Sequence, residues 1–209
     1  MNRFDYFVSE LQQLIPFRVR YKDESWEMQL INLVALWFCP DFMTRYTTVI
    51  GSTIYLPSRE YVEAQGDNVL RTLAHEVVHL LDAERWSEPA FMMAYLSPQV
   101  LALGVLSFPF LGFWSLIFLL FLLPIPSPFR FYFESRAYAM DVLTAHPALK
   151  ERTLQHSVGH FESMDYYLMF PFPKIVEQTI RYWIARAERG QDKILIKVLL
   201  VYELVNEEI

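Results

Sequence analysis

The sequence predicts a mainly α fold with a small β-sheet, an α+β class that is interrupted by a central hydrophobic helical hairpin. Three observations lead to this expectation. Apolar residues recur at helical spacing along most of the chain. Residues 46–56 are rich in β-branched and aromatic side chains and are followed by Pro57, which is typical of a strand. From Pro89 to Phe129 the chain contains no Lys, Arg, Asp or Glu.

Composition excludes several classes of protein. A chain of 209 residues is long enough for a domain with a sizeable core. Apolar residues make up 54% of it and charged residues 20%, which excludes intrinsic disorder. The net charge of -6 argues against a nucleic-acid partner, which attracts basic proteins. Cys39 is the single cysteine, so a disulfide scaffold and a cysteine-rich zinc module are both excluded.

Helical periodicity marks five segments, and capping or helix-breaking residues agree with the ends of some of them. Pro16 ends the first segment, and Asp67 precedes an apolar stripe that continues to about Trp86. A last segment with an apolar pattern follows Gly190. The expected helices span residues 4–15, 25–38, 67–86, 130–145 and 174–189.

The expected helix over 67–86 contains the pentapeptide His75-Glu76-Val77-Val78-His79, which fits the pattern His-Glu-x-x-His. Residues four apart lie on one helical face, so both imidazoles can reach one zinc ion. Glu76 is placed to take a proton from a metal-bound water and to return it to the leaving amine. The alternative is a pair of ordinary histidines on an amphipathic helix.

A catalytic zinc ion needs a third protein ligand and an open position for water. Glu134 is the favoured candidate, because it lies in an expected helix with Tyr138 and Asp141 on the same face. Small residues beside it, Ala137 and Ala139, would let this helix pack closely on the motif helix. Glu134 could instead be an exposed carboxylate that the helix dipole favours near a helix start.

The pairing of His-Glu-x-x-His with a downstream Glu-x-x-Ala, here Glu134 to Ala137, resembles the gluzincin metallopeptidases. Within them it is most similar to the integral-membrane group of the CAAX prenyl protease and the heat-shock protease HtpX. The resemblance covers roughly residues 46–141. It implies a zincin-like domain, one zinc ion on His75, His79 and Glu134, and Glu76 as the general base.

The chain departs from that group in two ways, and would be a reduced, divergent member. Tyr138 stands where the group has an aspartate that orients the first histidine, so Asp141 or Asp82 would supply this hydrogen bond. Asp82 is also an alternative third ligand. The two N-terminal membrane segments expected of HtpX are missing, because charges interrupt residues 1–45.

Peptide hydrolysis also needs a donor for the developing oxyanion. His160, which follows Gly159 in an expected loop, is the first choice, with a solvated loop histidine as the alternative, and Tyr138 is a second candidate. Other candidates that the sequence does not rank are Arg136, His146 and His156.

The uncharged stretch predicts contact with a membrane. A single crossing of the membrane would place His79 and Glu134 on opposite sides of the bilayer. The metal site therefore requires either no crossing or two. Two helices of about 18–20 residues fit, with a turn around residues 107–112, and flanking Arg85 and Arg130 agree with both ends facing the cytoplasm. Five prolines favour a broken or shallow hairpin instead. Burial in protein and an oligomer interface remain alternatives.

These observations divide the chain into three parts: residues 1–88 with the metal-binding helix, a hydrophobic hairpin of residues 89–129, and residues 130–209, which complete the metal site. We expect a membrane-associated zinc metalloendopeptidase that acts on a protein or peptide and faces the cytoplasm, with no signal peptide at Met1. One alternative is a structural or assembly protein with a closed or vestigial zinc site, either cytoplasmic or part of a larger assembly. Another is metal-dependent hydrolysis of a different substrate.

Overall fold

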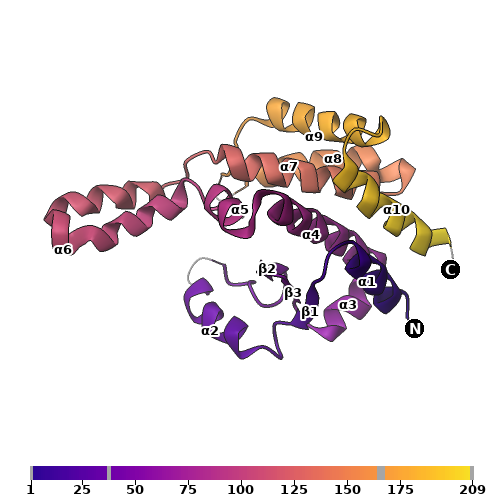
Figure 1. The fold of residues 1–209 in the computed structure, drawn as a ribbon, viewed down its shortest axis with the longest axis horizontal. Helices are drawn as coiled ribbons and strands as arrows, with labels where there is room; N and C mark the ends of the chain where they lie inside the picture. The colour runs from indigo at the N-terminus through magenta and orange to yellow at the C-terminus, as the bar shows by residue number, and fades with distance from the viewer. Residues whose placement is uncertain (1, 37–38, 164–167, 208–209) are drawn as a thin grey trace. The chain divides into compact units, whose positions relative to one another are not determined.

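A computed structural model describes residues 2–36, 39–163 and 168–207 (Figure 1). The described chain is mainly helical with one three-stranded sheet, which confirms the α+β class. It divides into two compact units: residues 1–81 with 192–209, and residues 82–191. The C-terminal helix thus belongs with the N-terminal residues, because its apolar face packs on the first helix of the chain.

The first unit contains helices at both ends of the chain. Phe7 and Tyr202 pack edge to face with ring centroids 5.9 Å apart, and Arg3 contacts both Asp67 and Asn206. The helices of this unit are α1 (Arg3–Leu14), α2 (Trp26–Ala35), α3 (Arg59–Gln65), the first fifteen residues of α4 (Asp67–Trp86), and α10 (Lys193–Glu207). Four of the five expected helices, and the last apolar segment, correspond to helices of the two units, with ends that agree to within a few residues. Residues 37 and 38 of the expected helix 25–38 lie outside the described residues.

The remaining expected helix is α4, which has the predicted range of 67–86. The expected strand at 46–56, by contrast, is two strands joined by a tight turn. Gly51 has a φ of 57°, a left-handed conformation that favours glycine and lets the chain reverse. The sheet has the order β1-β3-β2, in which β3 pairs parallel with β1 and antiparallel with β2. Its strands are β1 (Arg18–Tyr21), β2 (Thr48–Ile50) and β3 (Thr53–Leu56).

The second unit is built around α7, whose residues 133–140 are all buried. Helices α5, α8 and α9 pack against it. The prediction of a loop at His160 is wrong, because His160 lies in α8. The mixed polar sequence of this helix gives no clear helical pattern. The helices of this unit outside the hairpin are the last turn of α4, α5 (Glu88–Tyr95), α7 (Pro128–Leu143), the short 3-10 helix η3 (Pro147–Leu149), α8 (Lys150–Glu162) and α9 (Pro173–Glu188).

The apolar segment forms a hairpin of two 3-10 helices, η1 (Gln99–Ser107) and η2 (Gly112–Leu122), joined by the single turn α6 (Phe108–Leu111). The turn lies where the sequence places it, and Gly112, with a φ of 55°, reverses the chain. A Cβ added to Gly104 would lie 2.5 Å from the Phe118 ring, so glycine there lets the arms pack closely.

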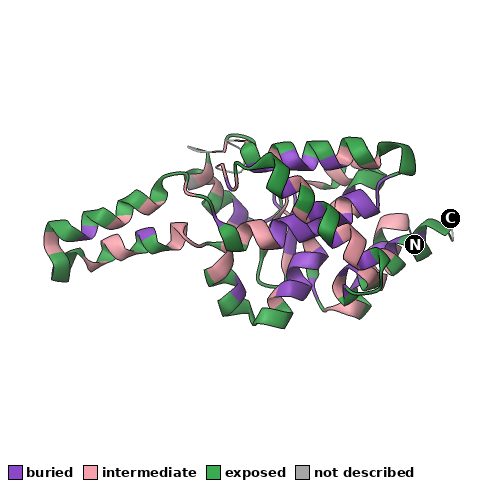
Figure 2. Cartoon of the chain, turned by 90° about the horizontal axis from the view of Figure 1, so that it is seen from above, coloured by how far each residue is buried: buried purple, intermediate pink, exposed green. Residues whose placement is uncertain are grey.

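The two long helices expected in this region do not form, since residues 96–98 separate α5 from η1. By length and composition one helical run, Gln99–Leu122, is apolar enough to cross a membrane, with a mean hydropathy of 2.3. Only 6% of an 18-residue apolar window within that stretch is buried. Figure 1 shows the hairpin extending beyond the ends of α7 and α9, and Figure 2 shows that little of it is buried.

Lys22, immediately after β1, is a fully buried lysine in the first unit. Its Nζ donates a hydrogen bond to the Phe42 carbonyl oxygen at 2.7 Å and lies 3.7 Å from the centroid of the Phe42 ring. Burial lowers the pKa of Lys22 to about 8, and the nearby Cys39 and Glu76 oppose this shift. The ammonium form is therefore disfavoured in the folded protein.

This burial predicts a rise in stability with pH. In the unfolded chain the pKa of Lys22 is 10.5, so between pH 8 and 10.5 the unfolded state holds a proton that the folded state has released. The free energy of unfolding should therefore increase from pH 7.5 to 9.5. Lys22→Met should remove this increase, measured as urea midpoints at the two pH values, whereas the exposed Lys174→Met should retain it. An equal rise in Lys22→Met would contradict the assignment.

Candidate metal centre

Helix α4 is buried over most of its circumference. Its apolar residues from Val69 to Leu81 are at most 6% exposed, and His75 and His79 retain only 9% and 7% of their surface. The helix begins with an acidic residue, Asp67, and has a basic residue, Arg85, in its last turn. Both charges interact favourably with the helix dipole and stabilise the helix ends. Burial on nearly all sides fixes the rotation of the helix, so the two imidazoles cannot simply turn into solvent.

Glu134 lies in the second turn of α7 and is 3% exposed. The Tyr95 hydroxyl, at the end of α5, donates a hydrogen bond to its Oε1. The Arg130 guanidinium lies 5.2 Å from the centre of the Tyr95 ring. Glu134 is thus a buried carboxylate and not the exposed helix-start residue of the alternative interpretation.

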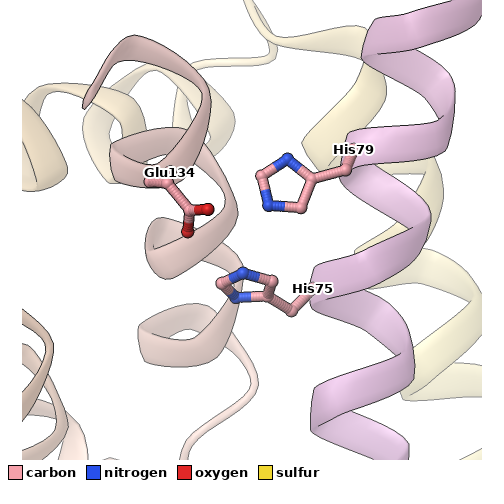
Figure 3. A group of neighbouring side chains, drawn as sticks. All are labelled: His75, His79 and Glu134. Carbon is pink, nitrogen blue, oxygen red and sulfur yellow. The ribbon is translucent and has the colours of Figure 1, made fainter. Parts of the chain in front are cut away.

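His75, His79 and Glu134 form one cluster. Each offers a ligand atom, and these atoms all lie within 4.8 Å of one another. Figure 3 shows both imidazoles extending from their helix toward the Glu134 carboxylate. The two rings have centroids 5.1 Å apart and planes inclined by 72°. This cluster could hold a metal ion.

A buried ion pair lies one turn from the cluster. Arg136, two residues after Glu134, contacts Asp82, three residues after His79, and their side chains are 3% and 0% exposed. The Arg136 guanidinium also lies 5.4 Å from the centre of the Trp183 ring. The pair joins the last turn of α4 to α7 within the second unit.

The other expected site residues lie outside the cluster among the described residues. Asp82 forms a buried ion pair with Arg136, a contact that the sequence does not suggest. The Tyr138 ring stacks on His160 with centroids 5.8 Å apart, and His160 Nε2 lies 3.3 Å from His156 Nε2. Asp141 follows on α7 and is partly exposed. Their assignment as orienting or oxyanion-stabilising groups stays a prediction.

Glu76 follows His75 directly, so it is rotated by about 100° around the helix from it. It is partly exposed, unlike its neighbours on both sides. Its charge acts on Lys22, which places the carboxylate near the end of β1. A carboxylate in this position is accessible to a water molecule without being one of the three clustered ligands.

Sequence reasoning missed Tyr95 and the role of Arg136. Tyr95 stands in the uncharged stretch, where a tyrosine is most simply one more apolar side chain, and it is 39 positions from Glu134. No local pattern joins residues so far apart. The Asp82–Arg136 pair had a weak signal: both charges lie in otherwise apolar helical patterns, which is typical of buried charges that are paired.

Comparison with family models, curated proteins and solved structures finds no match for this chain. The site is therefore interpreted from its residues and their geometry.

Tyr95→Phe tests the hydrogen bond to Glu134. Groups that hydrogen-bond a ligating side chain commonly contribute a factor of about 10–100 in metal affinity. We expect Tyr95→Phe to weaken Zn²⁺ binding by about tenfold or more in a competition titration against a chelator. Tyr61→Phe, on α3, is the matched control and should bind as the wild type does. Equal affinities for Tyr95→Phe and wild type would contradict this role.

Arg136→Met tests the buried ion pair. The substitution leaves Asp82 without its cation, and such losses cost about 3–5 kcal/mol. The double variant Asp82→Leu/Arg136→Met removes both charges and should recover most of that loss in urea unfolding. Arg59→Met, which removes the exposed pair with Glu24, should cost less than about 1 kcal/mol. A loss below about 1 kcal/mol in Arg136→Met would show that the pair does not hold the helices.

Proposed function

We propose that this protein is a zinc-dependent metallopeptidase of the gluzincin type, with a zincin-like arrangement of its metal-binding helix. The observation that carries the proposal is the clustering of His75, His79 and Glu134, where Glu76 is the residue next to His75 in the sequence. Glu134 is separated from the histidines by the whole apolar hairpin in sequence, so chance spacing of a pentapeptide does not account for its position.

The donor set favours zinc. Two imidazole nitrogens and one carboxylate oxygen are the ligands of known zinc peptidases, and they leave the fourth tetrahedral position open. Bonds of 2.0–2.1 Å in a tetrahedral site separate the ligand atoms by about 3.3 Å. Small side-chain rotations bring atoms within 4.8 Å of one another to that spacing.

Charge supports the same conclusion. Burial of a carboxylate is costly unless a positive group compensates it. The Glu134 carboxylate accepts a hydrogen bond from the Tyr95 hydroxyl and has two imidazoles beside it. A divalent cation at the cluster would compensate the Glu134 carboxylate and would use imidazoles in their neutral form.

Each residue then has a defined task. His75, His79 and Glu134 would hold the ion, which supplies a polarised carbonyl and a water of lowered pKa when it is bound. Glu76 takes a proton from the attacking water and transfers it to the leaving amine nitrogen. The buried helices exclude bulk water around these groups. The substrate is a protein or peptide.

Glu76→Gln separates metal binding from hydrolysis. The amide keeps the size of the side chain but cannot accept the proton, so turnover should fall by about 10²–10⁴-fold. Stoichiometric zinc, measured by elemental analysis, should remain. Activity is read as new termini in a complex peptide mixture by mass spectrometry. The matched control is Glu84→Gln, an exposed position on the same helix, which should keep both properties.

Two results would overturn the proposal. Unchanged turnover in Glu76→Gln would exclude this residue as the base. Stoichiometric zinc without any cleavage by the wild-type protein would favour a structural or assembly protein with a closed metal site. Zinc-dependent hydrolysis of a substrate other than peptide would retain the metal centre and replace only the substrate class.

A further inference from the structure

We propose that the hairpin of residues 99–122 inserts into one leaflet of a lipid bilayer and does not cross it. This inference concerns a surface that the metal centre does not use, and insertion does not depend on the peptidase activity.

The hairpin exposes large apolar side chains along the outer faces of both arms and at its end. At its end Phe110, Phe113 and Trp114 are 90%, 80% and 81% exposed. Along η2 consecutive residues are exposed, and consecutive residues of a 3-10 helix point about 120° apart. The exposed apolar residues of the arms are Leu101, Leu103, Leu106, Leu116, Ile117, Leu119, Leu120 and Leu122.

This distribution favours lipid over a protein partner. A partner protein covers one face of a helical hairpin and leaves polar residues on the other. Here the outer faces of both arms are apolar, and no charged residue occurs from Pro89 to Phe129. Lipid surrounds an inserted element on every side, so it accounts for the whole surface.

The few polar side chains of the hairpin are satisfied within the second unit, as an apolar medium requires. The Ser107 hydroxyl donates to the Gly104 carbonyl oxygen at 2.6 Å, and the Ser115 hydroxyl to that of Gly112 at 2.8 Å. Gln99, at the base, donates to the Ile125 carbonyl oxygen at 3.3 Å. Insertion therefore leaves these three side chains with hydrogen-bond partners.

Length decides between one leaflet and a crossing. A 3-10 helix rises about 2.0 Å per residue, so the nine residues of η1 span about 18 Å and the eleven of η2 about 22 Å. The hydrocarbon core of a bilayer is about 30 Å thick. Each arm is too short to cross it but long enough to enter one leaflet from the headgroup region. Both ends then leave on the same side.

The base of the hairpin is close to a metal ligand. Ser127, just after the hairpin, donates from its hydroxyl to the Ser97 carbonyl oxygen, just before it. Tyr95, two residues earlier, holds Glu134. Insertion would therefore bring Glu134 close to the lipid surface and favour membrane-anchored or surface-bound substrates. This last consequence, unlike insertion, rests on the proposed function.

Flotation with vesicles tests binding. The probe is phosphatidylcholine vesicles, with and without 30% phosphatidylglycerol. The wild type should float with both, because apolar insertion needs no anionic lipid. Phe110→Asp/Trp114→Asp should reduce the floating fraction at least tenfold. The matched control Trp26→Asp/Leu200→Asp changes two exposed apolar residues of the first unit and should float normally. Glu76→Gln should also float, which separates this test from that of the catalytic proposal.

Three flotation results would overturn the inference. These are failure of the wild type to float, normal flotation of Phe110→Asp/Trp114→Asp, and equal loss in the control. If the wild type does not float but dimerises in light scattering, and Phe110→Asp/Trp114→Asp is monomeric, the surface binds a second copy of the chain.

A cysteine at the end of the hairpin tests depth. In a Cys39→Ser background, Phe110→Cys is the single thiol, probed with a membrane-impermeant maleimide added outside vesicles or enclosed within them. Insertion into one leaflet predicts protection from both, with full labelling after detergent is added. Labelling from inside would show a crossing, and labelling from outside would show that the end stays in water. Either of these results would overturn the proposal.

Discussion

The packing of the last turn of α4 against α7 depends on the buried ion pair between Asp82 and Arg136. Burying two charges costs desolvation free energy unless the charges lie close enough to pair with each other. The last turn of α4 therefore has one favourable position along α7. His79 stands one turn before Asp82, and Glu134 stands two residues before Arg136. A shift of α7 by one turn along the last turn of α4 would separate this pair.

Glu134 is a buried carboxylate that must be hydrogen-bonded within the fold and that lies beside two imidazoles. It is buried in the most apolar part of α7, where only paired polar groups are tolerated. Tyr95 provides one hydrogen bond, and Trp183 helps to enclose the helix through its bond to Ser135 at 3.2 Å. An enclosed carboxylate beside two imidazoles is better suited to a cation than to a role in packing alone. The surrounding burial also keeps competing water away from the cluster.

The hairpin shows where local sequence predicts well and where it does not. Its turn follows from Gly112 and the prolines, because few residues adopt the required backbone conformations. Two longer helices also fit the sequence, although its prolines favour a broken hairpin, because uniform apolar composition carries no signal for where a helix ends. Local sequence also did not reveal β1, which has only four residues, or α8, whose polar residues resemble those of a loop. Cross-strand pairing and packing on α7 decide these elements.

By itself, the sequence determined the range of α4, the pair of histidines on one face, Glu134 as the residue expected to join them, and the apolar hairpin with its turn. These follow from local rules, since helical periodicity and turn chemistry act over a few residues. Only the tertiary structure decided that Glu134 is buried beside His75 and His79, that Asp82 pairs with Arg136, and that Tyr95 holds Glu134. Contacts between residues 39 to 59 positions apart depend on how whole helices pack, and no local pattern encodes that packing.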